Sequence, residues 1–258
     1  MNIDTNFDFT SGTPNFWSNY WTTDEILGYA GNDPDIASPT LKKYHQTLWS
    51  KALPNGQNME LSNGNDFGYL NWGDFRFGSD SVTASFRYKK YRYMIEQIAA
   101  KLPNYREFIE NYVHRSYTIG GEIIFPKMHG GINQSRGCNP FICDRFDLTL
   151  ECIRRFYLNE KSPLSEVLEK NKNFFELFVN FQGYVDFFFL NDLVTDDYTR
   201  IKFWCPVNLF EKYPFPKTVD EYLLFIDNEL TFVAERNKRI ENYAGNFTAE
   251  ILPSNQEK

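Results

Sequence analysis

Hydrophobic residues recur mainly every three or four positions in this chain, which is the pattern of amphipathic helices. Ser38 followed by Pro39 predicts a helix start, because Ser caps helices and Pro fits their first turn. That helix should end before the turn signal at residues 53–56. The same patterns predict helices over residues 16–21, 82–102, 103–115, 144–157, 173–194 and 218–242, another starting at Ser162, and a break at Gly183.

Three other stretches have the pattern of strands. Residues 57–78 hold short hydrophobic runs cut by Asn-Gly and Gly-Asp turns, which predicts short antiparallel strands. Residues 117–125, closed by Pro126, form a further candidate strand, and residues 200–204 another. Because strands and helices do not alternate regularly, a parallel doubly wound sheet is not expected. The sequence therefore predicts the α+β class, as a mostly helical single domain with a small antiparallel sheet.

Composition indicates a large core. The 258 residues include 25 Phe, 16 Tyr and 5 Trp, so 18% are aromatic, and each ring buries a large area. Hydrophobic residues at 42% and charged residues at 24% exclude a disordered chain and a collagen-like repeat. Since no linker is long or polar enough to divide the chain, we expect one globular domain over residues 1–258, with a core from about residue 7 to 243 and frayed termini.

The distribution of charge bears on the class of ligand. The net charge is −7, which argues against generic nucleic-acid binding, because that needs many cations. Residues 87–155 nevertheless hold 12 Lys and Arg against 7 Asp and Glu, giving +5, and the rest of the chain holds 15 against 27, giving −12. Either the basic segment binds an anion, or basic and acidic segments meet in the fold.

Several features predict a cytoplasmic protein with free thiols. Four cysteines are too few for a disulfide scaffold. The first ten residues are acidic and lack the apolar run of a signal peptide. The longest apolar stretch, residues 185–190, is too short to span a bilayer, so no membrane partner is expected. The four cysteines are Cys138, Cys143, Cys152 and Cys205.

Standard catalytic and cofactor motifs are missing from the sequence. It has no G-x-G-x-x-G, no phosphate-binding loop, no nucleophile elbow and no H-E-x-x-H. His129, Cys138 and Cys143 lie within fifteen residues, but their spacing matches no standard zinc site. A Cys/His pair such as Cys138 with His114 stays open. The sequence thus identifies no catalytic residue, no cofactor and no metal site.

One region is chemically suggestive. Residues 127–143 form a predicted Gly-rich loop that leads to a helix start at Asp144. Backbone N–H groups and the helix dipole favour an anion at such a place, and two arginines could clamp it. We therefore predict a pocket for an anionic small molecule such as a nucleotide or phosphate. Its predicted ligand-binding residues are Arg76, Ser79, Asn133, Gln134, Arg136 and Arg145.

A structural role for the same residues is the alternative. Asp144 would then cap its own helix, with Asp147 in a capping-box-like position. Arg136 and Arg145 would be ion-pair partners of Asp147 and Asp80 instead of ligand-binding groups.

The motifs INQSRG (132–137) and DRFDLTLECIRR (144–155) resemble an uncharacterised family of bacterial and phage-associated proteins, a domain of unknown function. The resemblance runs from about Phe7 to Ile240 and implies no activity, cofactor or catalytic residue. Two functions stay open: the anion pocket, or a non-enzymatic factor, phage- or defence-linked, that binds a protein partner through an aromatic patch. A concave pocket with converging arginines would favour the first, and a flat exposed aromatic patch the second.

Overall fold

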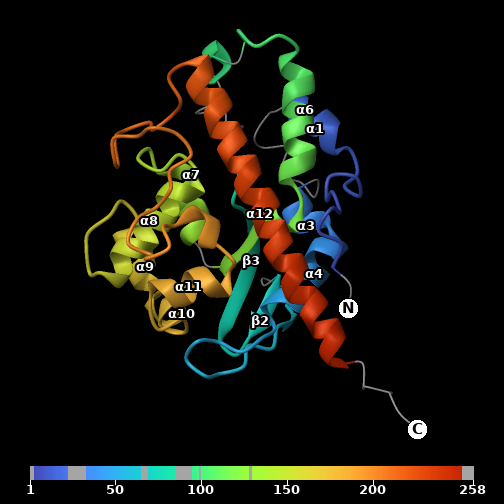
Figure 1. Cartoon of the computed structure of the whole chain (residues 1–258), viewed down its shortest axis with the longest axis vertical. Helices are drawn as coiled ribbons and strands as arrows, with labels where there is room; N and C mark the ends of the chain where they lie inside the picture. The colour runs from blue at the N-terminus through green and yellow to red at the C-terminus, as the bar shows by residue number, and fades with distance from the viewer. Residues whose placement is uncertain are drawn as a thin grey trace.

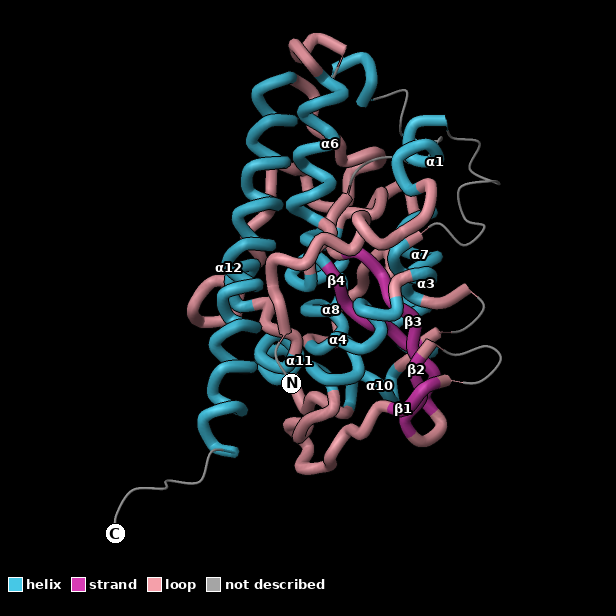
Figure 2. Tube along the Cα trace, turned by 90° about the vertical axis from the view of Figure 1, so that its right-hand side faces the viewer, coloured by secondary structure: helices cyan, strands magenta, loops and turns pink. Residues whose placement is uncertain are grey.

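Helices enclose a small antiparallel sheet in the computed structural model of the chain (Figures 1 and 2), which confirms the predicted α+β class. The structure describes residues 3–22, 33–64, 69–84, 95–98, 100–127 and 130–251. The helices are α1 (Phe16–Thr22), α3 (Pro34–Ala37), α4 (Pro39–Trp49), α6 (Tyr105–Ser116), α7 (Ile132–Cys138), α8 (Phe146–Tyr157), α9 (Ser165–Lys170), α10 (Lys172–Glu176), α11 (Phe181–Phe187) and α12 (Val219–Ile251), with short 3-10 turns η1 (Ile119–Gly121) and η2 (Asn191–Leu193).

Four strands form the sheet in the order β1 (Ser62–Asn63), β2 (Leu70–Trp72), β3 (Phe75–Ser81) and β4 (Glu122–Pro126), with every neighbouring pair antiparallel. Ser81 pairs with Glu122 at one end of β3 and β4, and Phe77 pairs with Pro126 at the other. The strands predicted within residues 57–78 are confirmed. In the predicted strand over 117–125, by contrast, residues 119–121 form η1, and the strand begins only at Glu122.

The helix α12 packs against α6 and against the turn η1 that leads into β4. It crosses the molecule diagonally in Figure 1, with α6 beside its first half. Tyr112 of α6 donates a hydrogen bond of 2.6 Å to the buried Glu229 of α12. Asn237 accepts a 2.7 Å hydrogen bond from the backbone N–H of Gly120. Any side chain at Gly120 would collide with the carbonyl oxygen of Val233, so this glycine lets α12 approach η1 closely.

The core is one cluster of buried hydrophobic residues that reaches from Ile3 to Ile240. Its centre is aromatic: the ring of Phe178 lies 5.1 Å from that of Phe174 and 5.4 Å from that of Phe188, measured between centroids. Tilted and edge-to-face contacts of this kind add to the stabilisation from burial. The large aromatic content of the sequence is thus used mainly inside the molecule.

Two further expectations concern membranes and thiols. Within the described residues, no helix combines the length and hydrophobicity needed to cross a bilayer. None of the four cysteines, all of which lie in the described residues, forms a disulfide, and Cys138 is the exposed one among them.

The structure corrects the prediction for residues 127–143. They are not a continuous loop, because residues 132–138 form α7. Asp144 is not the helix cap either, since it has a left-handed backbone with φ of +66° and α8 begins at Phe146, after Arg145. Asp144 therefore lies in the connection between two helices, and its side chain is available to another partner.

Several predicted boundaries are also wrong. The long apolar stretch breaks at residues 177–180, between α10 and α11, and Gly183 lies inside α11. The helix expected from Ser162 begins at Ser165. The predicted strand over 200–204 is reduced to one isolated bridge between Ile201 and Val194. Most of the helix predicted over 82–102 lies outside the described residues, although 95–98 are helical and 82–84 are not.

Candidate functional site

The paired strands β3 and β4 bring polar side chains to the same end of the sheet. Side chains of directly paired residues share a face, and side chains along one strand alternate between faces. Because Ser81 pairs with Glu122, the side chains of Ser79, Ser81 and Glu122 lie on one face of the sheet, and Asp80 lies on the other. The sheet therefore divides the candidate site into two halves that meet at β3.

On the first face, α3 and α4 place a chain of hydrogen bonds against the sheet. The indole Nε1–H of Trp49 donates to Nδ1 of His45 at 2.9 Å, and Nε2 of His45 lies 2.9 Å from Oγ of Ser79. The Ser79 hydroxyl donates in turn to Oδ1 of Asp35. Since Nδ1 accepts from Trp49, a neutral His45 carries its proton on Nε2 and donates it to Ser79. Every hydrogen bond in the chain therefore points toward Asp35.

Burial keeps His45 neutral. Its side chain is fully enclosed, and desolvation, followed by the charge of Arg236, lowers the pKa of His45 from 6.5 to about 3. This imidazole cannot take a proton from Ser79, because its only unprotonated nitrogen is held by Trp49. The arrangement therefore differs from a nucleophilic Ser–His pair, in which the histidine accepts the hydroxyl proton.

The chain ends in a pair of carboxyl groups. Glu122 is fully buried, and its oxygens receive no hydrogen bond from any amide, hydroxyl or cationic donor in the described part of the chain. Its carboxyl group instead faces that of the half-buried Asp35, and a hydrogen bond between the two requires a shared proton. Burial first, and then the charge of the partner carboxyl, raises the pKa of Glu122 well above its usual value. Burial, followed by the charges of Asp33 and Asp80, raises the pKa of Asp35 as well.

Arg236 of α12 lies next to this pair on the side that faces the protein interior. Its Nη1 donates at 2.8 Å to the carbonyl oxygens of Gly120 and Glu122, and its Nη2 has no hydrogen-bond partner within the described residues. Burial lowers the pKa of Arg236 to about 10, which leaves the guanidinium charged at neutral pH. A positive charge thus lies beside the carboxyl pair without forming an ion pair with it.

On the second face, Arg136 of α7 joins Asp80 and Asp144. Its Nη1 lies 2.8 Å from Oδ2 of Asp80 and 3.0 Å from Oδ1 of Asp144, and it also donates to the carbonyl oxygen of Ser81 at 3.0 Å. The Arg136 side chain is only 1% exposed, whereas those of Asp80 and Asp144 are 21% and 28% exposed. Burial raises the pKa of Asp144 to about 7 despite the opposing effect of Arg136. The two acids thus separate this guanidinium from solvent.

Arg145 occupies a different environment. Its Nε and Nη2 bind the two carboxylate oxygens of Asp147 at 3.1 and 2.5 Å, and its Nη1 donates to the carbonyl oxygen of Pro214 at 2.8 Å. Both side chains of this ion pair are 0% exposed. The structural alternative drawn from the sequence named both acids as partners of these arginines, and the structure pairs Arg136 with Asp80 and Arg145 with Asp147.

The other residues of the predicted ligand-binding set are dispersed. Asn133 joins the cluster through a 3.2 Å hydrogen bond from its Nδ2 to the carbonyl oxygen of Ser79. Gln134 is exposed and accepts from the backbone of Gly130. Arg76 is exposed on the same face of β3 as Asp80 but lies four residues away, about 13 Å along the strand. The structure thus brings Asn133 and Arg136 to neighbouring carbonyl groups of β3, places the Ser79 side chain on the other face of the sheet, and leaves Arg76 and Gln134 apart.

Sequence reasoning missed the most distinctive members of the cluster. Asp35, His45 and Glu122 come from three segments that meet only through tertiary contacts. A weak signal existed for His45, which precedes Trp49 by one helical turn, on the inner face of the predicted helix. No comparable signal marked Glu122, because an acid at the start of a predicted strand usually faces solvent.

Metal binding has no support from the cluster. Within the described residues, no group of three or more His, Cys, Asp or Glu side chains is arranged to hold a metal ion. His129, which the sequence placed near Cys138 and Cys143, lies outside the described residues.

Comparison with known proteins gives a family and no activity. The model of a family of unknown function, DUF6994, matches residues 3–240, nearly the whole chain. The chain belongs to this family. No curated protein and no solved structure matches it. Membership of DUF6994 assigns no activity, so the chemistry has to be argued from the carboxyl cluster itself.

Proposed function

We propose that this DUF6994 protein is an enzyme that uses the Asp35–Glu122 pair for proton transfer to and from a small polar substrate. The observation that carries the proposal is the approach of a fully buried carboxyl group to a half-buried one, with the pKa of both groups raised by burial and by neighbouring acids. Such pairs have widely separated titrations, so one group stays protonated while the other acts as a base. A structural role alone would not require this arrangement, because an unpaired buried carboxyl group destabilises the fold.

The direction of the hydrogen bonds, each of which is donated toward Asp35, supports a role for Asp35 as the base. Its carboxylate accepts hydrogen bonds from Ser79 and from protonated Glu122, and it is the member of the pair that reaches solvent. It can therefore take a proton from water or from a substrate hydroxyl, and Glu122 can redistribute the proton within the pair. Ser79 positions Asp35 in this scheme and is not a nucleophile.

The charges around the pair favour a neutral or cationic substrate. The carboxyl groups of Asp33 and Asp80 are close enough to raise the pKa of Asp35. Arg136 is already paired with Asp80 and Asp144. An anion would have to displace these two carboxylates and approach a third, at a cost in electrostatic energy. A polyol, a sugar or an amine could instead donate hydrogen bonds to the exposed carboxylate oxygens.

The anionic ligand predicted from the sequence is the second candidate, and the observation that favours it is that Asn133 and Arg136 both bind backbone carbonyl groups of β3, at Ser79 and Ser81. Protonation of Asp144, whose pKa is about 7, would free one side of Arg136 for an anion such as phosphate. Binding by this route would strengthen as the pH falls below 7, which distinguishes it from binding at the carboxylates.

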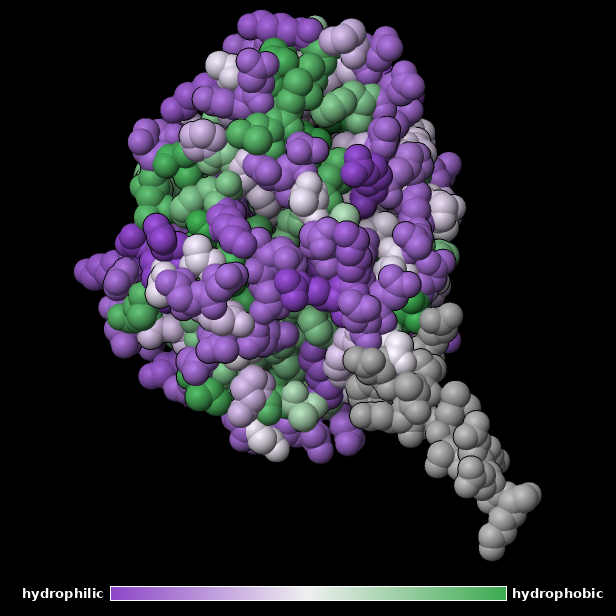
Figure 3. All heavy atoms as spheres, viewed as in Figure 1, coloured by the Kyte–Doolittle hydropathy of each residue, from purple (hydrophilic) through white to green (hydrophobic). Residues whose placement is uncertain are grey.

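A role as a protein-interaction factor receives less support from the surface. Of the large hydrophobic residues exposed in the described part of the chain, Phe141 is the aromatic one. On the face drawn in Figure 3, hydrophobic side chains lie in separate groups among polar ones. A flat aromatic patch would be the expected feature of an interaction surface of the predicted kind.

A thermal-shift panel tests the proposal. The probes are galactose, spermidine, inorganic phosphate and ATP, because a ligand at about 100 times its Kd adds about 2.7 kcal/mol of stability. We expect stabilisation by a neutral or cationic probe that is lost in Asp35→Asn and kept in the control Asp74→Asn, which alters an exposed acid in the β2–β3 turn. Stabilisation by phosphate or ATP that disappears in Arg136→Gln would contradict it and support the anion pocket.

A spectroscopic measurement tests the shared proton directly. Infrared spectra at pH 7.5 should contain a protonated carboxyl band that is absent from Glu122→Gln, because the glutamine amide replaces the acid without changing its size. If the spectra of the two proteins are identical in that region, both carboxyl groups are ionised and the acid–base proposal fails.

A further inference from the structure

A second polar group lies in an aromatic groove away from the carboxyl cluster. The groove has a volume of about 770 Å³ and lies between the turn after α4, the helix α11 and the last third of α12. This volume falls within the range of small-molecule sites. Its wall is mainly hydrophobic, with a few polar side chains. The residues that matter below are Lys51, Phe178, Asp186, Phe187, Phe189 and Tyr243.

Lys51 is held in the groove by aromatic rings. Its Nζ lies 4.0 Å from the ring centroid of Phe189, 4.4 Å from that of Phe187 and 4.8 Å from that of Tyr243. It donates one hydrogen bond of 2.7 Å, to the carbonyl oxygen of Phe187. No carboxylate within the described residues forms an ion pair with it. The amine therefore lacks a carboxylate counter-ion.

The surroundings shift Lys51 toward its neutral form. Burial first, and then the charge of Arg236, lowers the pKa of Lys51 to about 7. The other titratable groups at the groove are Asp186, which accepts hydrogen bonds from Asn191 and Tyr198, and the phenol of Tyr243. A lysine in this condition is a nucleophile at neutral pH, whereas an ordinary surface lysine is almost fully protonated.

We propose that the groove binds small, uncharged aromatic aldehydes or ketones and that the Lys51 amine condenses with their carbonyl group to form a Schiff base. The nitrogen attacks the carbonyl carbon, a C=N bond replaces the C=O bond, and the carbonyl oxygen leaves as water with the two amine hydrogens. Aromatic walls favour a flat ring, and Asp186 disfavours a negatively charged one. The single reactive amine at the wall selects the carbonyl group.

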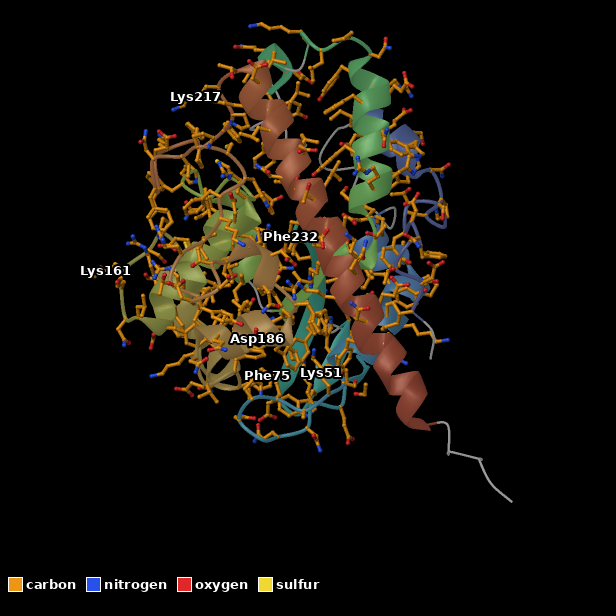
Figure 4. The ribbon with its side chains drawn as sticks, in the orientation of Figure 1. Lys51, Phe75, Lys161, Asp186, Lys217 and Phe232 are labelled. Carbon is orange, nitrogen blue, oxygen red and sulfur yellow. The ribbon has the colours of Figure 1, made fainter. Side chains whose placement is uncertain are left out.

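Reductive trapping tests this inference with benzaldehyde as the probe. The protein is incubated with a small excess of aldehyde and cyanoborohydride, and the modified lysines are identified by peptide mass mapping. We expect Lys51 to be modified first, at least tenfold faster than Lys161, an exposed lysine far from the groove in Figure 4. The rate at Lys51 should level off above pH 7, while the rate at Lys161 should continue to rise with pH.

Matched variants separate groove chemistry from general lysine reactivity. Lys51→Arg keeps a cation against the rings but has no condensing amine, so it should lose the fast modification, and Lys161→Arg should keep it. Phe189→Leu should slow the modification of Lys51 by removing the nearest ring. Modification spread evenly over the lysines, or a Lys51 rate that does not level off, would overturn the proposal even if the variants fail to fold, because both are measured on the unaltered chain.

Discussion

Two arginines from the same stretch of sequence are buried in different ways. Arg145 binds Asp147 through both carboxylate oxygens, and neither side chain reaches solvent. Arg136 is just as buried, but the acids that pair with it are partly exposed, and one of them, Asp80, lies close to the carboxyl pair. The first guanidinium joins the start of α8 to the connection near Pro214, so it serves the fold. The second lies at the edge of a site, where its partners can exchange with water or ligand.

The difference shows that burial of an arginine does not by itself decide whether the residue has a structural role or belongs to a binding site. A closed, bidentate ion pair has no open position and cannot bind anything else. A guanidinium whose partners are exposed acids, with raised pKa values, can lose a partner by protonation. The amino-acid sequence alone does not distinguish these two kinds of arginine. The stability of variants at each position does.

The largest effect is expected at the closed pair. Arg145→Met should lower the free energy of unfolding by about 3–5 kcal/mol, because it leaves the Asp147 carboxylate buried without its partner. Denaturant unfolding measures this loss. The double variant Arg145→Met with Asp147→Leu should recover part of it, since a hydrophobic pair replaces the buried charges. If the double variant is less stable than the single one, the loss has another origin.

A smaller effect is expected at the open pair. Arg136→Gln should cost about 1–3 kcal/mol, because Asp80 and Asp144 can be hydrated or protonated once the guanidinium is gone. The loss should be smaller at pH 5.5 than at pH 8, measured by the same unfolding experiment. Equal losses at Arg136 and Arg145 at both pH values would remove the distinction between the two sites.

The next largest effect is the change in protein stability with pH that titration of Asp144 causes. Its pKa is about 7 in the fold and 3.8 in the unfolded chain, so the folded protein binds the proton more tightly. The resulting stability is present below pH 4 and is lost as the pH rises to about 7, by at most about 1.4 kcal/mol per pH unit. Asp144→Asn cannot undergo this loss. Its stability relative to the unaltered chain should therefore rise between pH 4 and 7 and then level off in thermal melts.

The smallest effect is expected at the exposed arginine. Arg76→Ala should change the free energy of unfolding by less than about 0.5 kcal/mol, since the side chain lies in solvent on β3. This variant is the control for the two buried arginines in denaturant unfolding. A loss above about 1 kcal/mol would show that Arg76 has a structural partner.

The sequence predicted elements well where the pattern was local. The helix from Pro39 to Trp49 starts at the expected Ser38 cap, and α6 and α12 follow their hydrophobic stripes. The pattern failed at residues 132–138, because Gly and Ser within INQSRGC suggested a loop, whereas the segment is held as a helix by packing and by Arg136. Tertiary contacts override weak local propensity in such segments.

The candidate site was predicted only in part, for a related reason. The sequence named Asp147 and Asp80 as partners for Arg136 and Arg145, but the contact of Arg136 with Asp80 depends on the register of β3 and β4. Asp35 and Glu122 come together only because α3, which carries Asp35, packs against β3, and the register of β3 and β4 turns Glu122 toward it. A one-residue shift of the strands would turn Glu122 to the opposite face and separate the two carboxyl groups.

The position of Arg236 in the chain has a consequence for synthesis. Glu122 leaves the ribosome 114 residues before Arg236, which corresponds to roughly 6–23 s at roughly 5–20 residues per second. Until α12 arrives, the carboxyl pair lacks the cation behind it, and Gly120 lacks its bond to Asn237. A nascent chain therefore carries an incomplete site, and a chain cut short before α12 would be a natural substrate for proteases.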